Sequence, residues 1–252
     1  MITDPWFYAA AIPAVLLFGI SKGGFGGGLG TLSVPLIALV ISPVQAAGIL
    51  LPILCLMDLV SLWAYRGKWV WSELRVLLPA SLLGIAIGTL LFGFMSSAVI
   101  RLIIGTVALA FTLHYLLHMR AAGQTKQSDF PRSVGAIGGA VAGFTSFVAH
   151  AGGPPISMYL LRRPLNRTDF VATTVLFFTV VNYTKLIPYA WLGQLDASNL
   201  LTSLVLAPLA PLGVGIGVYL HKRVSDRFFF LSVYALLAAV GAKLLWDGLS
   251  QL

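Results

Sequence analysis

The sequence predicts an all-α polytopic membrane protein made of two inverted repeats, each a broken or re-entrant helical hairpin followed by three transmembrane helices. Composition gives the class, because 58% of the 252 residues are hydrophobic and only 10% are charged, against about 25% charged residues in soluble domains. The mean hydropathy is +0.93. Apolar runs of spanning length recur along the chain. The two halves also correspond to each other at a shift of 124 residues.

The first hairpin is predicted near the N-terminus, where the apolar runs 6–20 and 29–41 are each shorter than the roughly 20 residues of a spanning helix. Between them, six of the eight residues from 23 to 30 are glycines, and Lys22 precedes them. Irregular backbone at membrane depth must be buried in protein or line a cavity, because lipid leaves its amides unpaired. We therefore expect the tip of a hairpin here, followed by a half-helix that begins near residues 28–31.

Three spans follow the first hairpin, over residues 43–65, 74–94 and 98–118, and the polar stretch 120–132 is the natural linker. The second half has an apolar run over 134–150, a break at 151–155 and a short run over 156–161. Spans over 169–191, 199–220 and 228–249 complete it. We therefore divide the chain into a first repeat (1–119), a cytoplasmic linker (120–132) and a second repeat (133–252).

The correspondence between the halves rests on pairs of residues that keep the same order in both. Each pair is a weak signal alone, but together they make an internal repeat the expected organisation, which is typical of secondary transporters. The ungapped pairs are Gly19 with Gly143, Ser21 with Thr145, Asp58 with Asn182 and Tyr65 with Tyr189; after a small insertion, Gly84 and Gly88 pair with Gly213 and Gly217.

Lysine and arginine placement predicts the topology. Most basic residues lie in the stretches 66–75, 120–132, 162–167 and 222–227, which should be cytoplasmic. All four lie on one side only if each broken segment enters and leaves on the same side, or if each consists of two full spans; the short lengths favour re-entrant hairpins. Both termini are then outside, and the second half is inverted relative to the first.

The two breaks are predicted to form one substrate site near the middle of the membrane. The half-helices after them would direct free amides and positive dipole ends into it, and Lys22 and His150 would add a charge and a hydrogen-bond donor. The competing interpretations are close helix packing for the glycines, snorkelling or carbonyl pairing for Lys22, and a neutral, backbone-bonded His150. The candidate substrate-binding residues are Ser21, Lys22, Gly23, Gly24, Gly26, Gly27, Gly28, Thr31, Thr145, His150, Gly152 and Gly153.

Ion coupling has three candidate residues, Asp58, His150 and Asn182. A carboxylate within a span suggests a proton or cation site, and Asp58 is equally able to pair with Lys22. Lys185 is expected to snorkel to the outer surface rather than to meet Asp58. No metal site or cofactor is predicted, because the i, i+4 pair His114 and His118 has no clear third ligand.

Other function classes find little support in the sequence. The net charge of +8 fits the positive-inside bias of membrane proteins, and no continuous basic face indicates a nucleic acid partner. An enzyme is not predicted, since adjacent helix positions such as Ser21 and Lys22 do not face each other and no catalytic set is visible. No ATP-binding loop of the GxxxxGK[ST] form is present.

The glycine-rich tip 19–30, followed by Leu32-Ser33-Val34-Pro35, and the later Gly152-Gly153-Pro154-Pro155 resemble the TauE/SafE family of sulfite exporters and sulfonate permeases over essentially the whole chain. The resemblance implies a carrier in the bacterial inner membrane that moves sulfite, a sulfonate or a related small oxyanion by alternating access, with a passive anion channel as the alternative. Its partners would be the anion, membrane lipid and a coupled proton or cation; oligomeric state, a homodimer included, is left open. His150-Ala151 replaces a glycine triplet at the second tip, so the two tips are chemically unequal.

Overall fold

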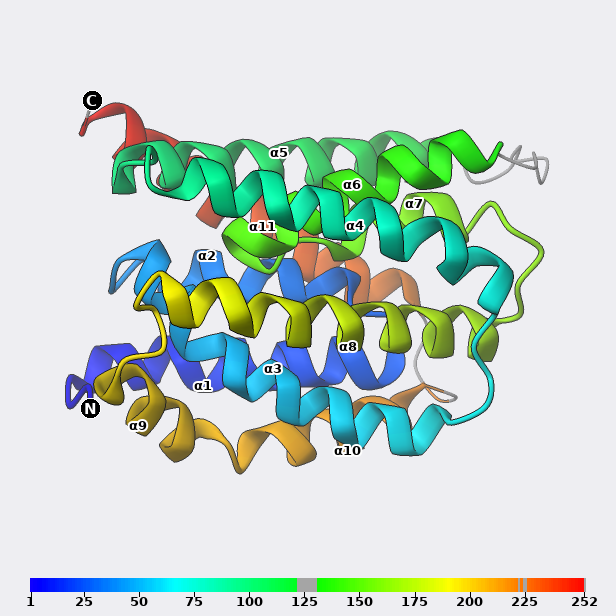
Figure 1. Cartoon of the computed structure of the whole chain (residues 1–252), viewed down its shortest axis with the longest axis horizontal. Helices are drawn as coiled ribbons and strands as arrows, with labels where there is room; N and C mark the ends of the chain where they lie inside the picture. Colours follow the sequence, from blue (N-terminus) through cyan, green and yellow to red (C-terminus); the bar gives the residue numbers. More distant parts are fainter. Residues whose placement is uncertain (122–130, 222, 224–225, 252) are drawn as a thin grey trace.

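The computed structural model describes residues 1–121, 131–221, 223 and 226–251, and this part of the chain is helical without strands. The helices lie roughly along one direction (Figure 1). Their bounds, in chain order, are α1 Pro5–Gly24, η1 Gly28–Leu32, α2 Ser33–Ile37, α3 Pro43–Tyr65, α4 Trp71–Phe92, α5 Ser97–Ala121, α6 Arg132–Ala149, α7 Gly153–Leu160, α8 Arg167–Trp191, α9 Ala197–Leu206, α10 Leu209–Leu220 and α11 Asp226–Leu249.

Four described helices, α1, α3, α4 and α8, are long and apolar enough to cross a membrane. The predicted span 199–220 is instead two helices, α9 and α10, which meet at a bend of 44° and together make a fifth candidate span. Pro208 explains the bend, because proline has no amide to donate and restricts the backbone of the residue before it. The chain is therefore a polytopic helical membrane protein, as the sequence predicts.

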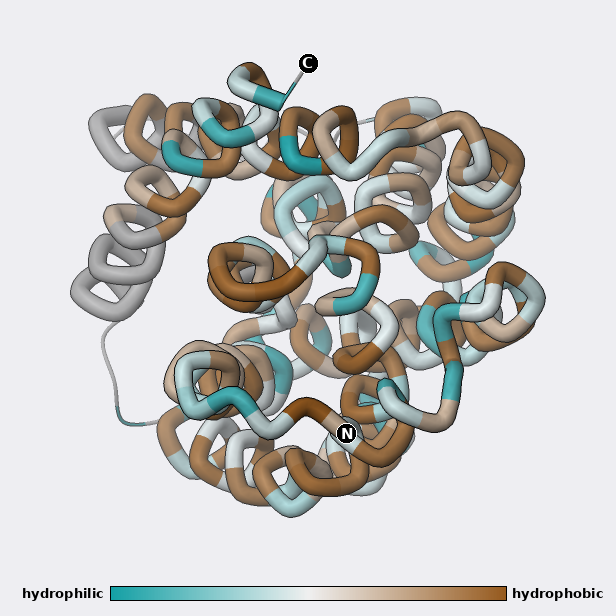
Figure 2. Tube along the Cα trace, turned by 90° about the vertical axis from the view of Figure 1, so that its left-hand side faces the viewer, coloured by the Kyte–Doolittle hydropathy of each residue, from teal (hydrophilic) through white to brown (hydrophobic). Residues whose placement is uncertain are grey.

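The outside of the bundle carries many large apolar side chains. Seen end-on, hydrophobic segments lie on several sides of the periphery (Figure 2). Large side chains such as Trp6, Ile187 and Trp191 are each more than three-quarters exposed. A soluble protein rarely exposes apolar area on this scale, whereas lipid is the solvent that such a surface fits.

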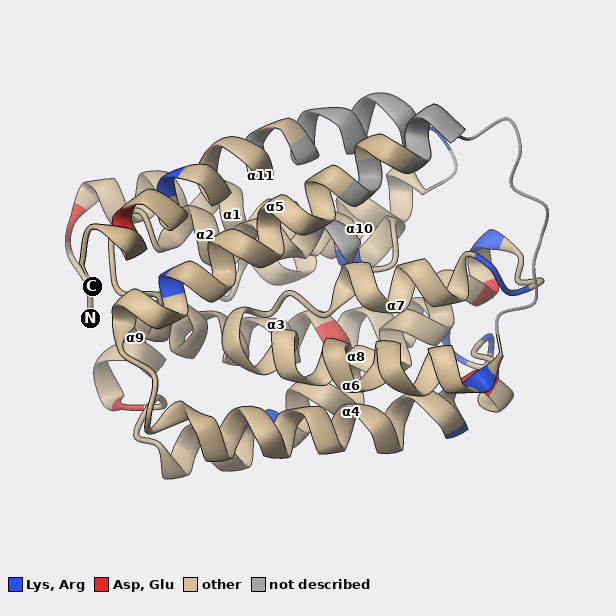
Figure 3. Ribbon diagram, turned by 90° about the horizontal axis from the view of Figure 1, so that it is seen from above, with Lys and Arg blue, Asp and Glu red and all other residues tan. Residues whose placement is uncertain are grey.

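Both broken segments return to the end of the bundle at which they start. In Figure 1, α1 runs away from the end that holds both termini, and the chain comes back through α2 to that end before α3 begins. From the opposite end α6 runs inward, and α7 returns to that opposite end. Most lysines and arginines gather there, away from the termini (Figure 3). The return of each broken segment to its own end is the arrangement that the positions of the basic loops favour.

Matching contacts recur in the two halves at the shift of 124 residues. The Tyr65 hydroxyl donates to the Gly23 carbonyl at 2.6 Å, and the Tyr189 hydroxyl donates to the Phe147 carbonyl at 2.6 Å. Each bond joins the third helix of a half to the end of that half's broken helix. The contacts α3 with α8 and α5 with α11 also join corresponding helices. The same residue shift therefore relates contacts in the two halves as well as residues in the sequence.

The broken helix of each half packs on a helix of the other half. α1 lies against α10, where a methyl group on Gly19 would come within 2.8 Å of Gly213 and one on Gly23 would overlap the Val214 carbonyl. In the same way α6 lies against α4, where a methyl on Gly84 would overlap the Ala140 carbonyl. Glycine is therefore required at these contacts because the two backbones touch.

The two tyrosine contacts give a direct test of the repeat. Replacing Tyr65 by phenylalanine removes one hydroxyl-to-carbonyl bond, and Tyr189→Phe removes its counterpart. We expect each change to lower the free energy of unfolding by about 1 kcal/mol, and by similar amounts. Thermal unfolding in detergent measures this, with Tyr219→Phe, whose ring is mostly exposed, as the control. Strongly unequal losses would argue against equivalent roles.

Candidate anion site at the two helix breaks

The first break is shorter than the sequence suggests. α1 continues through Gly24, and the irregular stretch is confined to residues 25–27. Gly26 and Gly27 have φ values of +70° and +76°, in the left-handed region that favours glycine. The Ser21 carbonyl accepts from the amides of Phe25 and Gly27 at 2.8 and 3.1 Å. Lys22 therefore lies in the last turn of a helix, and the half-helix after the break begins at Gly28, as predicted.

The second break reverses the chain at His150, whose φ of +51° is left-handed although it is not a glycine. Such a conformation is uncommon for a residue with a side chain and is held here by its neighbours. The Thr145 hydroxyl lies 3.1 Å from the Ala151 carbonyl and the Ala151 amide donates to the Thr145 carbonyl. α7 then begins at Gly153 with two prolines in its first turn, as expected for a half-helix.

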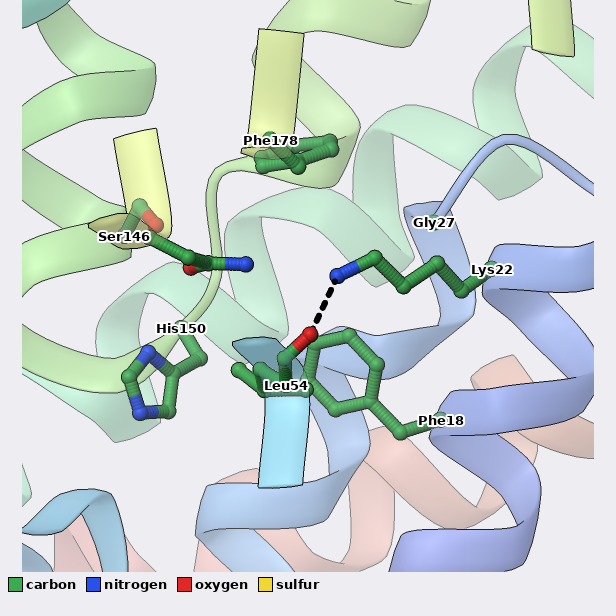
Figure 4. Close-up of a pocket in the computed structure, with 8 residues that line it drawn as sticks. Phe18, Lys22, Gly27, Leu54, Ser146, His150 and Phe178 are labelled. Atoms are coloured by element: carbon green, nitrogen blue, oxygen red, sulfur yellow. Dashed lines mark hydrogen bonds between the residues drawn. The ribbon is translucent and has the colours of Figure 1, made fainter. Parts of the chain in front are cut away.

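A small cavity lies between the two breaks and draws its lining from both halves. It encloses about 10 Å³, close to the minimum that one water molecule requires. Lys22 points into it from one side, and Ser146 and His150 face it from the other (Figure 4). The full lining is Phe18, Lys22, Gly27, Leu54, Ser146, His150, Phe178 and Asn182. A sulfonate group is larger than one water, so it fits only if these side chains move apart.

Lys22 is held by a buried carboxylate. Its Nζ lies 2.6 Å from Asp58 Oδ1 and donates to the Leu54 carbonyl at 3.2 Å, and both charged side chains are at most 2% exposed. The other oxygen of Asp58 accepts from Asn182 Nδ2 at 2.8 Å, while Thr179 Oγ1 donates to Oδ1 at 3.1 Å. Asp58 and its repeat partner Asn182 thus touch at the interface of α3 and α8. Of the roles considered for Asp58, the structure shows the pairing with Lys22.

A second network joins His150 to a second lysine. Lys185 Nζ lies 2.8 Å from His150 Nδ1 and donates to the carbonyl and hydroxyl oxygens of Ser146, each at 3.0 Å. His150 Nε2 lies 2.9 Å from the Ala47 carbonyl. A carbonyl oxygen only accepts, so the hydrogen-bond pattern assigns the ring proton to Nε2 and leaves Nδ1 as the acceptor for Lys185. His150 therefore has a bond to the backbone and also faces the cavity.

The expectation that Lys185 snorkels is wrong. Its side chain is completely buried at the interface of α8 and the end of α6. The position of Lys185 along its helix suggested a surface location, but the residue lies on the face of α8 that is directed into the protein. The repeat shift offered a signal that was missed, because it pairs Lys185 with Ser61 and Lys22 with Ser146. At these two positions the first half has a lysine on α1 and a serine on α3, whereas the second half has a serine on α6 and a lysine on α8.

The structure divides the predicted glycines into two groups. Gly23 and Gly24 are helical and lie against α10, where a methyl group would overlap the backbone of Val214 and Gly217, so helix packing accounts for them. Gly26, Gly27 and Gly152 surround the breaks: a methyl on Gly26 would meet the Phe170 ring at 2.5 Å, and one on Gly152 would lie 2.7 Å from the Ala142 carbonyl. Gly153 starts α7, and Gly28 starts η1.

The predicted hydroxyl residues are buried near the breaks but do not line the cavity. Ser21, Thr31 and Thr145 are each at most 5% exposed. Ser146, which does line it, is a possible hydroxyl donor in the sequence that is weighed against ordinary helix packing, whereas Thr179, Leu54 and the rings of Phe18 and Phe178 are not predicted. No cluster of metal-ligating side chains occurs among the residues that the structure describes, which do not include the side chains of His114 and His118.

Fold and site together define a polytopic helical membrane protein with a charged, enclosed centre between two interrupted helices. Residues 11–244 match the family described as Sulfite exporter TauE/SafE, and the chain belongs to this family. A relative from Cupriavidus necator, a probable sulfite/organosulfonate exporter TauE, is 24% identical over 238 residues, which cover 92% of this chain and 87% of the relative. No solved structure matches the chain. The family is one of exporters rather than enzymes.

Proposed function

We propose that the protein is a secondary transporter that moves a small sulfur oxyanion, sulfite or an organosulfonate, across the bacterial inner membrane. The charge around the cavity carries the proposal. Lys22 lines the cavity and Lys185 lies behind its wall, and Asp58, the carboxylate described beside them, pairs with Lys22. One buried amine therefore has no carboxylate partner, and an anion in this low-dielectric interior would balance the positive charge that this amine can carry. The names of the family and of the relative narrow that anion to sulfur oxyanions.

The anion would bind between the two breaks. Lys22 supplies charge from one side, and His150 and Ser146 supply polar groups from the other. The start of α7 adds the amides of Gly152 and Gly153, which donate no hydrogen bond within the described chain. Exposed amides and the positive end of a helix dipole favour a negative ligand. A sulfonate is weakly basic, so several neutral donors and one cation suit it.

Alternating access would come from movement of the hairpins 1–42 and 131–166 against the remaining helices. The inverted repeats 1–119 and 133–252, joined by the cytoplasmic linker 120–132, would give two equivalent ways to open the site. The matching tyrosine and glycine contacts support this equivalence. The basic loops support a topology with both termini outside. Asp58, His150 and Asn182, the coupling candidates from the sequence, all lie in the cavity lining or directly beside it.

Transport by the purified protein in proteoliposomes tests the proposal. We expect saturable flux of sulfite or methanesulfonate, and much weaker flux of acetate, because a sulfur oxyanion offers three oxygens to the proposed donors and acetate offers two. Protein-free liposomes give the background. A passive channel would instead give flux that does not saturate and that does not depend on counter-ions. The small closed cavity supports a carrier rather than a channel. Absence of flux for every sulfur oxyanion, with folded protein present, would overturn the proposed function.

A further inference from the structure

The two buried lysines, Lys22 in the cavity lining and Lys185 behind Ser146 and His150, have different kinds of partners. Lys22 faces a carboxylate and a carbonyl oxygen, which only accept hydrogen bonds. Removing its proton would leave the Asp58 charge buried without a cation. The geometry therefore pairs Lys22 with Asp58 as a buried ion pair.

Lys185 has no ion pair among the described residues. Its partners are the Ser146 carbonyl, the Ser146 hydroxyl and His150 Nδ1. As an ammonium, Lys185 donates to all three. As a neutral amine, it donates to the carbonyl and to Nδ1, and it accepts from the hydroxyl, which carries both a donor and acceptors. The same three contacts thus satisfy either protonation state without a side-chain movement.

The charge balance differs between those two states. With Lys185 neutral, the positive Lys22 and the negative Asp58 cancel, and the buried cluster is neutral overall. With Lys185 charged, one positive charge is buried without a counter-ion, which costs several kcal/mol. An anion in the adjacent cavity, which Ser146 and His150 separate from Lys185, supplies that counter-ion.

We propose that Lys185 takes up one proton from solution when the anion binds, so that the protein binds and moves a monoanion together with a proton. The proton adds to the free electron pair of Lys185 Nζ and converts the amine to an ammonium, and no other bond changes. Release of the anion returns the proton. This inference rests on the proposed function and adds its coupling ion and the residue that carries it.

Other groups near Lys185 must be considered as the proton acceptor. His150 faces it from the end of α6, Lys22 from α1, and Asp58 and Cys55 from α3. α4 also packs on α8, and its buried acid, Glu73, pairs with Arg163 near the start of α8. Asp58 is bound by three donors, and the His150 ring faces Lys185 through Nδ1. Cys55 is a thiol without such contacts, so Cys55→Ser is the control.

Calorimetry of anion binding tests the proposal on the full-length protein in detergent. Methanesulfonate is the probe, because it does not titrate near neutral pH, and buffers with different ionisation enthalpies reveal the protons exchanged. We expect uptake of about one proton per bound anion at mildly alkaline pH, with affinity falling about tenfold per pH unit there. At lower pH uptake should vanish, because Lys185 is already charged.

Variants then assign the proton to its residue. Lys185→Arg keeps the charge permanently, so we expect it to bind methanesulfonate without proton uptake and without the alkaline loss of affinity. Cys55→Ser should behave as the wild type. Three results would overturn this inference and leave the proposed function intact. They are wild-type binding with no proton uptake at any pH, proton uptake that persists in Lys185→Arg, and proton uptake that is lost in Cys55→Ser. Failure of the wild type to bind would overturn both.

Discussion

Replacing Lys22 by methionine is expected to abolish anion flux and to destabilise the protein together. The change removes the cation that points into the cavity. It also leaves Asp58 buried without its ion-pair partner, which costs about 3–5 kcal/mol. Flux in proteoliposomes and thermal unfolding in detergent measure the two effects on one preparation.

A double variant separates the two effects. Lys22→Met combined with Asp58→Asn removes both charges, and the amide keeps an acceptor for Asn182 or Thr179. We expect most of the lost stability to return, because no uncompensated charge stays buried, while flux remains absent. Full flux in either variant would show that Lys22 does not bind the anion. Continued instability of the double variant would show that the ion pair is not the main source of the loss.

Gly23→Ala is expected to have the second large effect. The added methyl group would overlap the Val214 carbonyl, so α1 and α10 would have to separate. Overpacking of this kind costs about 1–3 kcal/mol, and more where the obstacle is backbone that cannot rotate away. Because Lys22 is the neighbouring residue, separation of the helices would also move the cation. We expect a lower unfolding temperature and weaker anion binding.

Gly215→Ala is the matched control for this substitution. Gly215 lies on the same helix α10, yet nothing lies within 4 Å of a methyl group placed on it. Alanine there is expected to leave flux unchanged and to stabilise the helix by up to about 1 kcal/mol. Equal losses in both variants would mean that the contact between α1 and α10 is not the cause.

The spans were predictable because lipid imposes a simple length rule on apolar runs. The predicted span 43–65 coincides with α3, and the second break lies where its prolines and glycines stand. The predicted first break was too long, because the prediction assigned all of the glycines to the break although some of them lie in a helix. Gly26 and Gly27 turn the chain, whereas Gly23 and Gly24 remain helical and let α10 approach. Composition does not distinguish these purposes; only the partner helix does.

The candidate site was predictable where a residue type is unusual for its surroundings, as for Lys22 and His150, which both line the cavity. Lys185 was missed because depth along a helix does not give the direction of a side chain. The apolar groups Phe18, Leu54 and Phe178 carry no chemical signal in a chain of this composition, so only packing reveals them.

The exchange of packing partners between the halves has a consequence for biosynthesis. α1 leaves the ribosome first, but its contact surface on α10 is made only after almost two hundred further residues have followed. Chains grow at about 5–20 residues per second, so the glycine face of this helix lacks its partner α10 for many seconds. Neither half can complete its own interior, and a chain that stops before α10 leaves that face uncovered. Correct packing of the first helix therefore depends on synthesis of nearly the whole chain.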